Sequence, residues 1–208
     1  MNASFMPLFA APLMQVQLDL DSEKLIEFAF EMWNKDKKGV QETNRGGWHS
    51  ENIIEEKHEE FIKLKKEITQ QLQTYHLEVF QDMKFKKSVI QSMEKVWVNI
   101  NEKYHHNEWH VHGFSTLSGA YYIKYDGFEY GDIMFKNPFG SYISDVHWPQ
   151  GLVEKWGGVT SEIIEFTPKS NMLLIFPSWL EHKVETNLKN DSRISVSFNS
   201  NIISEKKS

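Results

Sequence analysis

The chain has 208 residues, a formal net charge of −6 and no cysteine. The lack of cysteine excludes disulfides, thiolate metal sites and a thiol nucleophile, so any metal site must be built from His, Asp and Glu. The acidic charge argues against an electrostatic nucleic-acid binder. No apolar run is long enough to span a bilayer.

The first residues are apolar, but no basic residue precedes them and two prolines interrupt them. This pattern argues against a signal peptide. We therefore interpret the segment from Phe5 to Leu13 as a first strand and expect a cytoplasmic protein, in host cytoplasm if the chain is viral.

The basic residues divide unevenly into 21 Lys and two Arg, Arg45 and Arg193. Codon usage in an AT-rich genome explains most of the Lys excess. A surviving Arg then marks a position where the planar, two-pronged guanidinium is hard to replace. Both arginines are therefore candidates for a specific role.

Residues 19–95 show mainly helical periodicity. Asp21 is a suitable cap for a helix whose apolar residues recur at helical spacing. A loop rich in Lys, Gly and Asn follows, which contains residues 44–48, and its two glycines, Gly46 and Gly47, predict a turn. Ile53 to Leu77 then reads as an amphipathic helix with a solvated outer face.

The remaining chain shows the alternation of short strands separated by turn signals. Many short strands at this spacing predict a sandwich or barrel. We expect one α+β domain over residues 1–208, with residues 1–93 as mainly helical support that packs on one sheet and residues 94–203 as the β core. The predicted strands cover residues 96–101, 110–112, 118–124, 131–135, 161–166, 172–176 and 193–199.

Histidines gather in the first part of this β region. Residues two apart in a strand point to the same face, so His110 and His112 are expected to project together. Two imidazoles on one face make a plausible pair of metal ligands. A third histidine, His182, is expected in a turn that follows an apolar strand broken by Pro177.

The strand over residues 193–199 has two different faces. One face carries Arg193, Ser195 and Ser197, and the other carries apolar residues. An inward Arg and Ser need an anionic partner. A carboxylate suits both, because Arg can grip it with two hydrogen bonds and the hydroxyl adds a third.

These motifs together resemble the Fe(II)- and 2-oxoglutarate-dependent oxygenases, and within them a small group found in marine bacteria and phages. The resemblance runs from the first third of the chain almost to its end. It implies a double-stranded β-helix, also called a jelly roll or cupin-like fold. The matching stretches are Gly46–Ser50, His110–His112, Leu117–Tyr122, Phe176–His182 and Arg193–Asn199.

The resemblance implies that His110 and His182 bind iron and that Arg193 and Ser195 bind 2-oxoglutarate. Most of that superfamily has Asp or Glu where this chain has His112. A carboxylate could arrive from Asp126 or Asp132, but both sit near turns, so we favour a three-histidine site. Imidazole suits Fe(II), and neutral ligands leave its full charge to attract a dianionic co-substrate.

Other polar residues have open alternatives. Tyr122, Lys124, Asn99 and Asn101 are expected to face inward, where they could contact 2-oxoglutarate or simply pack. For Arg45 we expect a loop salt bridge. His105, His106 and His147 are assigned to the surface, the rim or a structural role.

The resemblance implies a hydroxylase that uses Fe(II), 2-oxoglutarate and O₂, acts on a peptide or small-molecule substrate, and releases succinate and CO₂. Two alternatives stay open. One is a three-histidine cupin-type dioxygenase without co-substrate, which would not need Arg193 and Ser195. The other is a non-enzymatic jelly-roll binding or virion-associated protein, which would not need converging histidines. The helices could also form a homodimer face.

Overall fold

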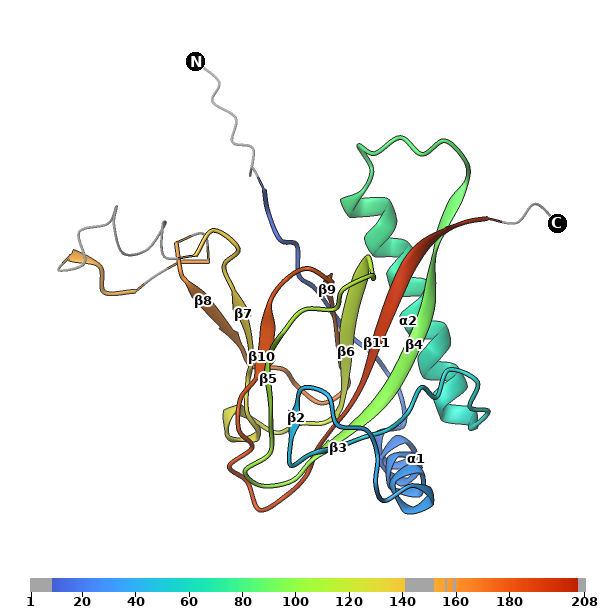
Figure 1. Cartoon of the computed structure of the whole chain (residues 1–208), viewed down its shortest axis with the longest axis vertical. Coiled ribbons are helices and arrows are strands. Elements are labelled where there is room, and N and C mark those ends of the chain that lie inside the picture. Colours follow the sequence, from blue (N-terminus) through green and yellow to red (C-terminus); the bar gives the residue numbers. More distant parts are fainter. Residues whose placement is uncertain (1–8, 141–151, 156, 159, 206–208) are drawn as a thin grey trace.

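The structure is a computed structural model that describes residues 9–140, 152–155, 157–158 and 160–205. Two antiparallel sheets face each other, and two helices cover the outer face of the larger one (Figure 1). In chain order the elements are β1 (Met14–Gln17), α1 (Ser22–Lys35), β2 (Asn44–Arg45), β3 (Trp48–His49), α2 (Glu59–Val79), β4 (Val89–Asn101), β5 (His106–His110), β6 (Leu117–Lys124), η1 (Phe128–Tyr130), β7 (Ile133–Lys136), β8 (Ile163–Phe166), β9 (Met172–Pro177), β10 (His182–Val184) and β11 (Arg193–Ser204).

The larger sheet has the order β1-β9-β6-β11-β4-β3 and the smaller sheet has the order β2-β5-β10-β7-β8. Every strand pair among the described residues is antiparallel. This is the predicted α+β fold: a double-stranded β-helix with N-terminal helices packed on one sheet. The prediction of the fold class is confirmed.

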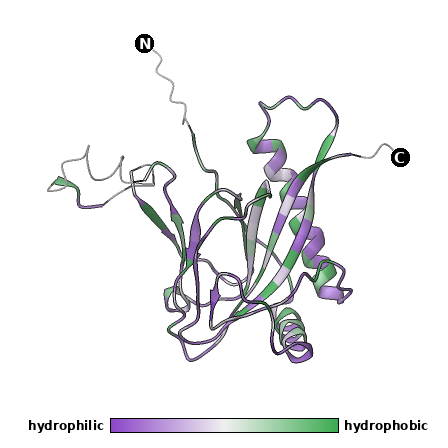
Figure 2. Cartoon of the chain, in the orientation of Figure 1, coloured by the Kyte–Doolittle hydropathy of each residue, from purple (hydrophilic) through white to green (hydrophobic). Residues whose placement is uncertain are grey.

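The helices attach to the larger sheet through one apolar stripe each. Helix α1 begins after Asp21, whose carboxylate accepts from the backbone N–H of Lys24 at 3.2 Å, as the sequence predicts. Hydrophilic and hydrophobic bands alternate along α2 (Figure 2), because the apolar residues at helical spacing all turn toward the sheet. The buried stripe of the two helices comprises Leu25, Phe28, Ala29, Phe61, Leu64, Ile68, Leu72 and Tyr75.

Strand β11 lies at the centre of the larger sheet, between β4 and β6. Its Ile194, Val196 and Phe198 are completely buried in the core beneath the helices. Its Arg193, Ser195 and Ser197 face the space between the two sheets. The two-faced pattern read from the sequence is therefore present, and it directs the polar face into the interior of the sandwich.

Several local predictions differ from the structure. Strand β4 begins at Val89 rather than at residue 96, within the segment predicted to be mainly helical, and the predicted loop contains the short strands β2 and β3. The first strand begins at Met14 rather than in the segment from Phe5, of which only residues 9–13 are described. Helix α2 begins at Glu59 rather than Ile53, because the backbone N–H of Ile53 donates to the carbonyl of Val96 and holds this segment beside β4.

The strand expected over residues 110–112 is β5, which ends at His110. His182, expected in a turn, begins a strand, β10, that pairs with both β5 and β7. The prediction for His147 falls outside the described residues. No helix in the described ranges combines the length and apolarity needed to cross a membrane.

Candidate functional site

A cavity of about 120 Å³ lies between the two sheets. Residues that are directly opposite on neighbouring strands share a face of the sheet. One such row crosses four strands of the larger sheet: His49 on β3, Asn99 on β4, Ser195 on β11 and Tyr122 on β6. All four side chains line the cavity.

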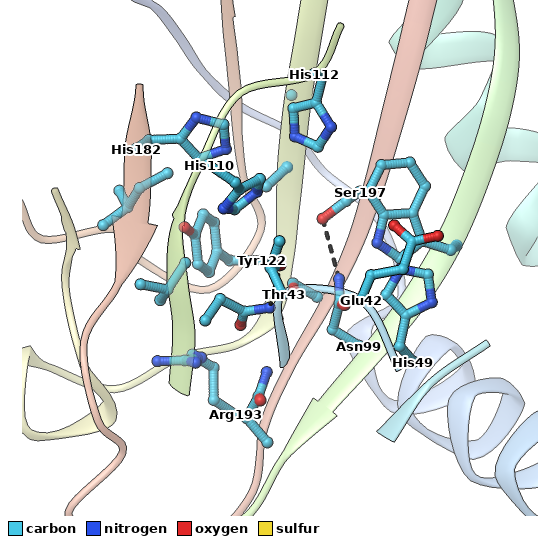
Figure 3. A pocket seen from close by; sticks show the side chains of 18 of the residues that line it. Glu42, Thr43, His49, Asn99, His110, His112, Tyr122, His182, Arg193 and Ser197 are labelled. Atoms are coloured by element: carbon cyan, nitrogen blue, oxygen red, sulfur yellow. Dashed lines mark hydrogen bonds between the residues drawn. The ribbon is translucent and has the colours of Figure 1, made fainter. Parts of the chain in front are cut away.

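The three histidines from the sequence converge at one end of this cavity (Figure 3). Their nearest ligand nitrogens all lie within 4.8 Å of one another. His110 and His182 are paired across β5 and β10, and His112 comes from the loop just beyond β5. The backbone N–H of His112 donates to the carbonyl of Ser178 at 3.0 Å, which fixes this loop against the turn after β9.

The hydrogen bonds of two rings leave them ready to bind a metal. Nδ1 of His110 lies 2.7 Å from the carbonyl of Glu108, and Nδ1 of His182 lies 2.8 Å from the carbonyl of Leu180. A carbonyl only accepts, so Nδ1 carries the proton and Nε2 keeps its lone pair. This backbone anchoring is the usual second contact of a metal-binding histidine.

Burial also keeps these rings neutral. Burial, together with a smaller contribution from the neighbouring His110, lowers the pKa of His182 to about 3 and that of His112 to about 4. The pKa of His110 is lowered too, mainly by burial. Three neutral imidazoles at neutral pH offer lone pairs to a cation, so the donor set fits a divalent transition metal.

Arg193 lies deep in the cavity with 1 % of its surface exposed. Its Nη1 donates to the carbonyls of Tyr130, Gly131 and Glu185 at 2.5, 3.1 and 3.0 Å. Its Nη2 is buried and has no partner among the described residues. No carboxylate in the described chain forms an ion pair with this guanidinium, and burial lowers its pKa to about 10. The unpaired donors fit a carboxylate that enters the cavity.

The other predicted co-substrate residues divide into two groups. Tyr122 is 2 % exposed, and Ser195 and Asn99 are also buried against the cavity. Asn101 lies opposite Arg193 and has a buried, unpartnered Oδ1. Lys124 does not reach the cavity, because its Nζ pairs with Asp191 at 2.6 Å.

The alternative carboxylates do not approach the histidines. Asp132 accepts from the hydroxyls of Tyr125 at 2.6 Å and Thr167 at 2.7 Å. Neither Asp132 nor Asp126 lines the cavity. The cluster of possible ligands in the described chain consists of histidines alone.

Two ionisable residues of the cavity were not assigned to it from the sequence. Glu42 and His49 both line the cavity, and His49 stacks on Trp97 with ring centroids 5.3 Å apart. For His49 the available signal was the motif over residues 46–50, which has no periodicity of its own, and Glu42 lies outside that motif. Arg45, beside that motif, lies 3.5 Å from Glu108 in the expected exposed salt bridge and takes no part in the cavity.

The model of the 2OG-Fe(II) oxygenase family matches residues 95–199, just over half of the chain. No curated protein matches the sequence at a significant level. Among solved structures, the fold is similar to a prolyl-4-hydroxylase from Pseudomonas putida, with 13 % identity, a TM-score of 0.58, and 91 % of this chain and 92 % of that chain covered.

Two further structures show the same fold. The viral collagen prolyl hydroxylase of Paramecium Bursaria Chlorella virus-1, solved with 2OG, has 12 % identity and a TM-score of 0.55, with 93 % of this chain and 96 % of that chain covered. HygX from Streptomyces hygroscopicus, solved with nickel, 2-oxoglutarate and hygromycin B, has 11 % identity and a TM-score of 0.56, with 92 % and 83 % covered.

Proposed function

The chain belongs to the 2OG-Fe(II) oxygenase family, and from this premise we propose that it hydroxylates a peptide side chain, a free amino acid or a small metabolite. As a member of this family it is an oxidoreductase that uses Fe(II) and 2-oxoglutarate. The observation that carries the proposal is one cavity with two complementary ends: three neutral histidines at one, and the unpartnered Nη2 of Arg193 at the other.

We assign the iron to His110, His112 and His182, and the far carboxylate of 2-oxoglutarate to Arg193. Ser195 lies two residues from Arg193 on the same face of β11, where its hydroxyl can donate to the same carboxylate. Tyr122 and Asn99, which flank Ser195 in the register row, complete the polar wall.

Iron, when bound here, supplies the activation of O₂ that converts 2-oxoglutarate to succinate and CO₂ while one oxygen atom enters a C–H bond of the substrate. The protein chain positions the co-substrate and keeps water away from the reacting atoms. Arg193 fixes one end of the co-substrate in a buried place, and the apolar walls exclude water from the reacting end. Those walls are formed by Ala120, Ile133, Phe176 and Val184.

The test has two stages. Anaerobic addition of Fe(II) and then 2-oxoglutarate to the purified chain should produce the weak visible band of the metal–co-substrate complex. Admission of ¹⁸O₂ with candidate substrates should then yield succinate and a product heavier by one labelled oxygen. A protein that binds neither iron nor 2-oxoglutarate would refute the proposal. Formation of succinate together with an unlabelled, rearranged product would show that the enzyme catalyses an oxidation other than hydroxylation.

A further inference from the structure

The cavity has a second arm that the iron and 2-oxoglutarate assignments leave unused. Figure 3 shows Glu42 and His49 together on the side of Asn99 and Ser197, away from Tyr122 and Arg193. Both side chains line the same cavity as the three histidines. We call this side of the cavity, defined by Glu42, His49 and Trp97, the second arm; none of these three residues is assigned to iron or to 2-oxoglutarate.

His49 presents a fixed hydrogen-bond acceptor to this arm. It is 4 % exposed, and its Nδ1 lies 2.6 Å from the carbonyl of Ser50. The carbonyl can only accept, so Nδ1 carries the proton and Nε2 keeps its lone pair. No hydrogen-bond partner of Nε2 is seen within the described ranges. The stack on Trp97, at an interplanar angle of 14°, holds the ring in this orientation.

Glu42 adds a negative charge to the same arm. Its Oε1 accepts from Nζ of Lys95 at 3.2 Å, and half of the side chain is exposed. Lys95 itself does not line the cavity. Its Nζ also lies 5.2 Å from the centre of the Trp97 ring, so this aromatic face already accepts one cation. The arm therefore offers a carboxylate and an imidazole lone pair beside an aromatic ring that His49 and Lys95 already contact.

We propose that the second arm binds a cationic nitrogen group of the substrate, an ammonium or a guanidinium, through Glu42 and His49. The inference rests on the proposed function and names the substrate class for it. A purely apolar substrate would displace water from both acceptors without replacing the hydrogen bonds, which is unfavourable. An N–H cation satisfies Glu42 by charge and His49 by donation.

The experiment compares pentylamine, pentylguanidine and 1-pentanol as ligands of the anaerobic enzyme loaded with Fe(II) and 2-oxoglutarate. Their dissociation constants are read from the change in the visible band. We expect at least one cation to bind about tenfold more tightly than the alcohol, because a hydrogen bond to a charged group adds about that factor. Comparison of pentylamine with pentylguanidine shows whether the site prefers an ammonium or a guanidinium.

The variants separate recognition from structure. Glu42→Gln should remove the cation preference, whereas Lys95→Gln should strengthen it, because Glu42 then loses its competing partner. A merely structural ion pair would make both variants weaken binding alike. Glu129→Gln is the matched control: it is also half-exposed and paired with a lysine, at 2.7 Å, but it does not line the cavity, so its constants should equal those of the wild type.

The outcomes are distinct. Equal binding of cations and alcohol, with a normal visible band, would overturn this inference and leave the proposed function standing. A cation preference that survives Glu42→Gln would mean that the amine contacts the metal or another site, and would also overturn it. Absence of the visible band in the wild type would overturn both.

Discussion

Replacing Arg193 by Lys keeps the charge and removes the planar fork, which makes it the sharpest test of the co-substrate site. Nη1 of Arg193 already donates to three carbonyls, whereas Nη2 is buried and has no partner in the described chain. An ammonium has three N–H donors. The carbonyls of Tyr130, Gly131 and Glu185 would take all three, and none would remain for the cavity.

The expected loss follows from this count. Nη2 carries two N–H groups, and a hydrogen bond to a charged group contributes about 1.5 kcal/mol. Two such bonds amount to about 3 kcal/mol, or about a hundredfold in the dissociation constant of 2-oxoglutarate. The retained positive charge limits the loss to roughly this size. Iron binding should be unchanged, because the three histidines keep their own backbone contacts.

The assay is an anaerobic titration of the Fe(II) enzyme with 2-oxoglutarate, followed at the visible band. Arg45→Lys serves as the control, since Arg45 is exposed and lies in a salt bridge with Glu108 outside the cavity. A thermal melt shows whether the Arg193→Lys protein is folded. If the folded variant binds 2-oxoglutarate as tightly as the wild type, Nη2 is not the partner of the carboxylate and the reasoning fails.

Three further predictions use other assays. His182→Ala should abolish stoichiometric Fe(II) binding in equilibrium dialysis, because two ligands remain; unchanged stoichiometry would contradict the site. Gly131→Ala should weaken 2-oxoglutarate binding by at least about tenfold, or about 1.4 kcal/mol, while iron binding persists. The reason is that Gly131 has φ +88° and that a Cβ there would collide with the Glu185 carbonyl and press on Nη1 of Arg193. Asp21→Ala removes the α1 cap and should lower the free energy of unfolding in urea by about 1 kcal/mol, with no change in iron affinity.

Features with a strong local pattern were predictable from the sequence. The two faces of β11 follow from simple alternation, so Arg193 and Ser195 could be placed toward an interior ligand. Asp21 was identifiable as a cap because capping involves only the next three residues. The approach of His182 to His110 required the family resemblance as well, since the two lie on different strands.

Features set by long-range pairing were less accessible. β5 ends at His110 because its partner β10 begins at His182, directly opposite His110. Nothing in residues 110–112 themselves signals that end. The start of α2 depends on the contact between Ile53 and Val96. His49 enters the cavity through a two-residue strand paired with β4, which is too short for any periodicity to be read.

The polar face of β11 carries buried polar groups, which destabilise the fold when they lack partners but can bind a ligand. Polar groups buried in a sandwich need partners. Ser197 receives one from Asn99 at 3.0 Å, and Nη1 of Arg193 is saturated by carbonyls. Nη2 of Arg193 and Oδ1 of Asn101, on opposite residues of two paired strands, are left without partners in the described chain. The unpartnered donor Nη2 belongs to a residue that lines the cavity, where a carboxylate can accept from it, so 2-oxoglutarate binding should also stabilise the folded state, by mass action.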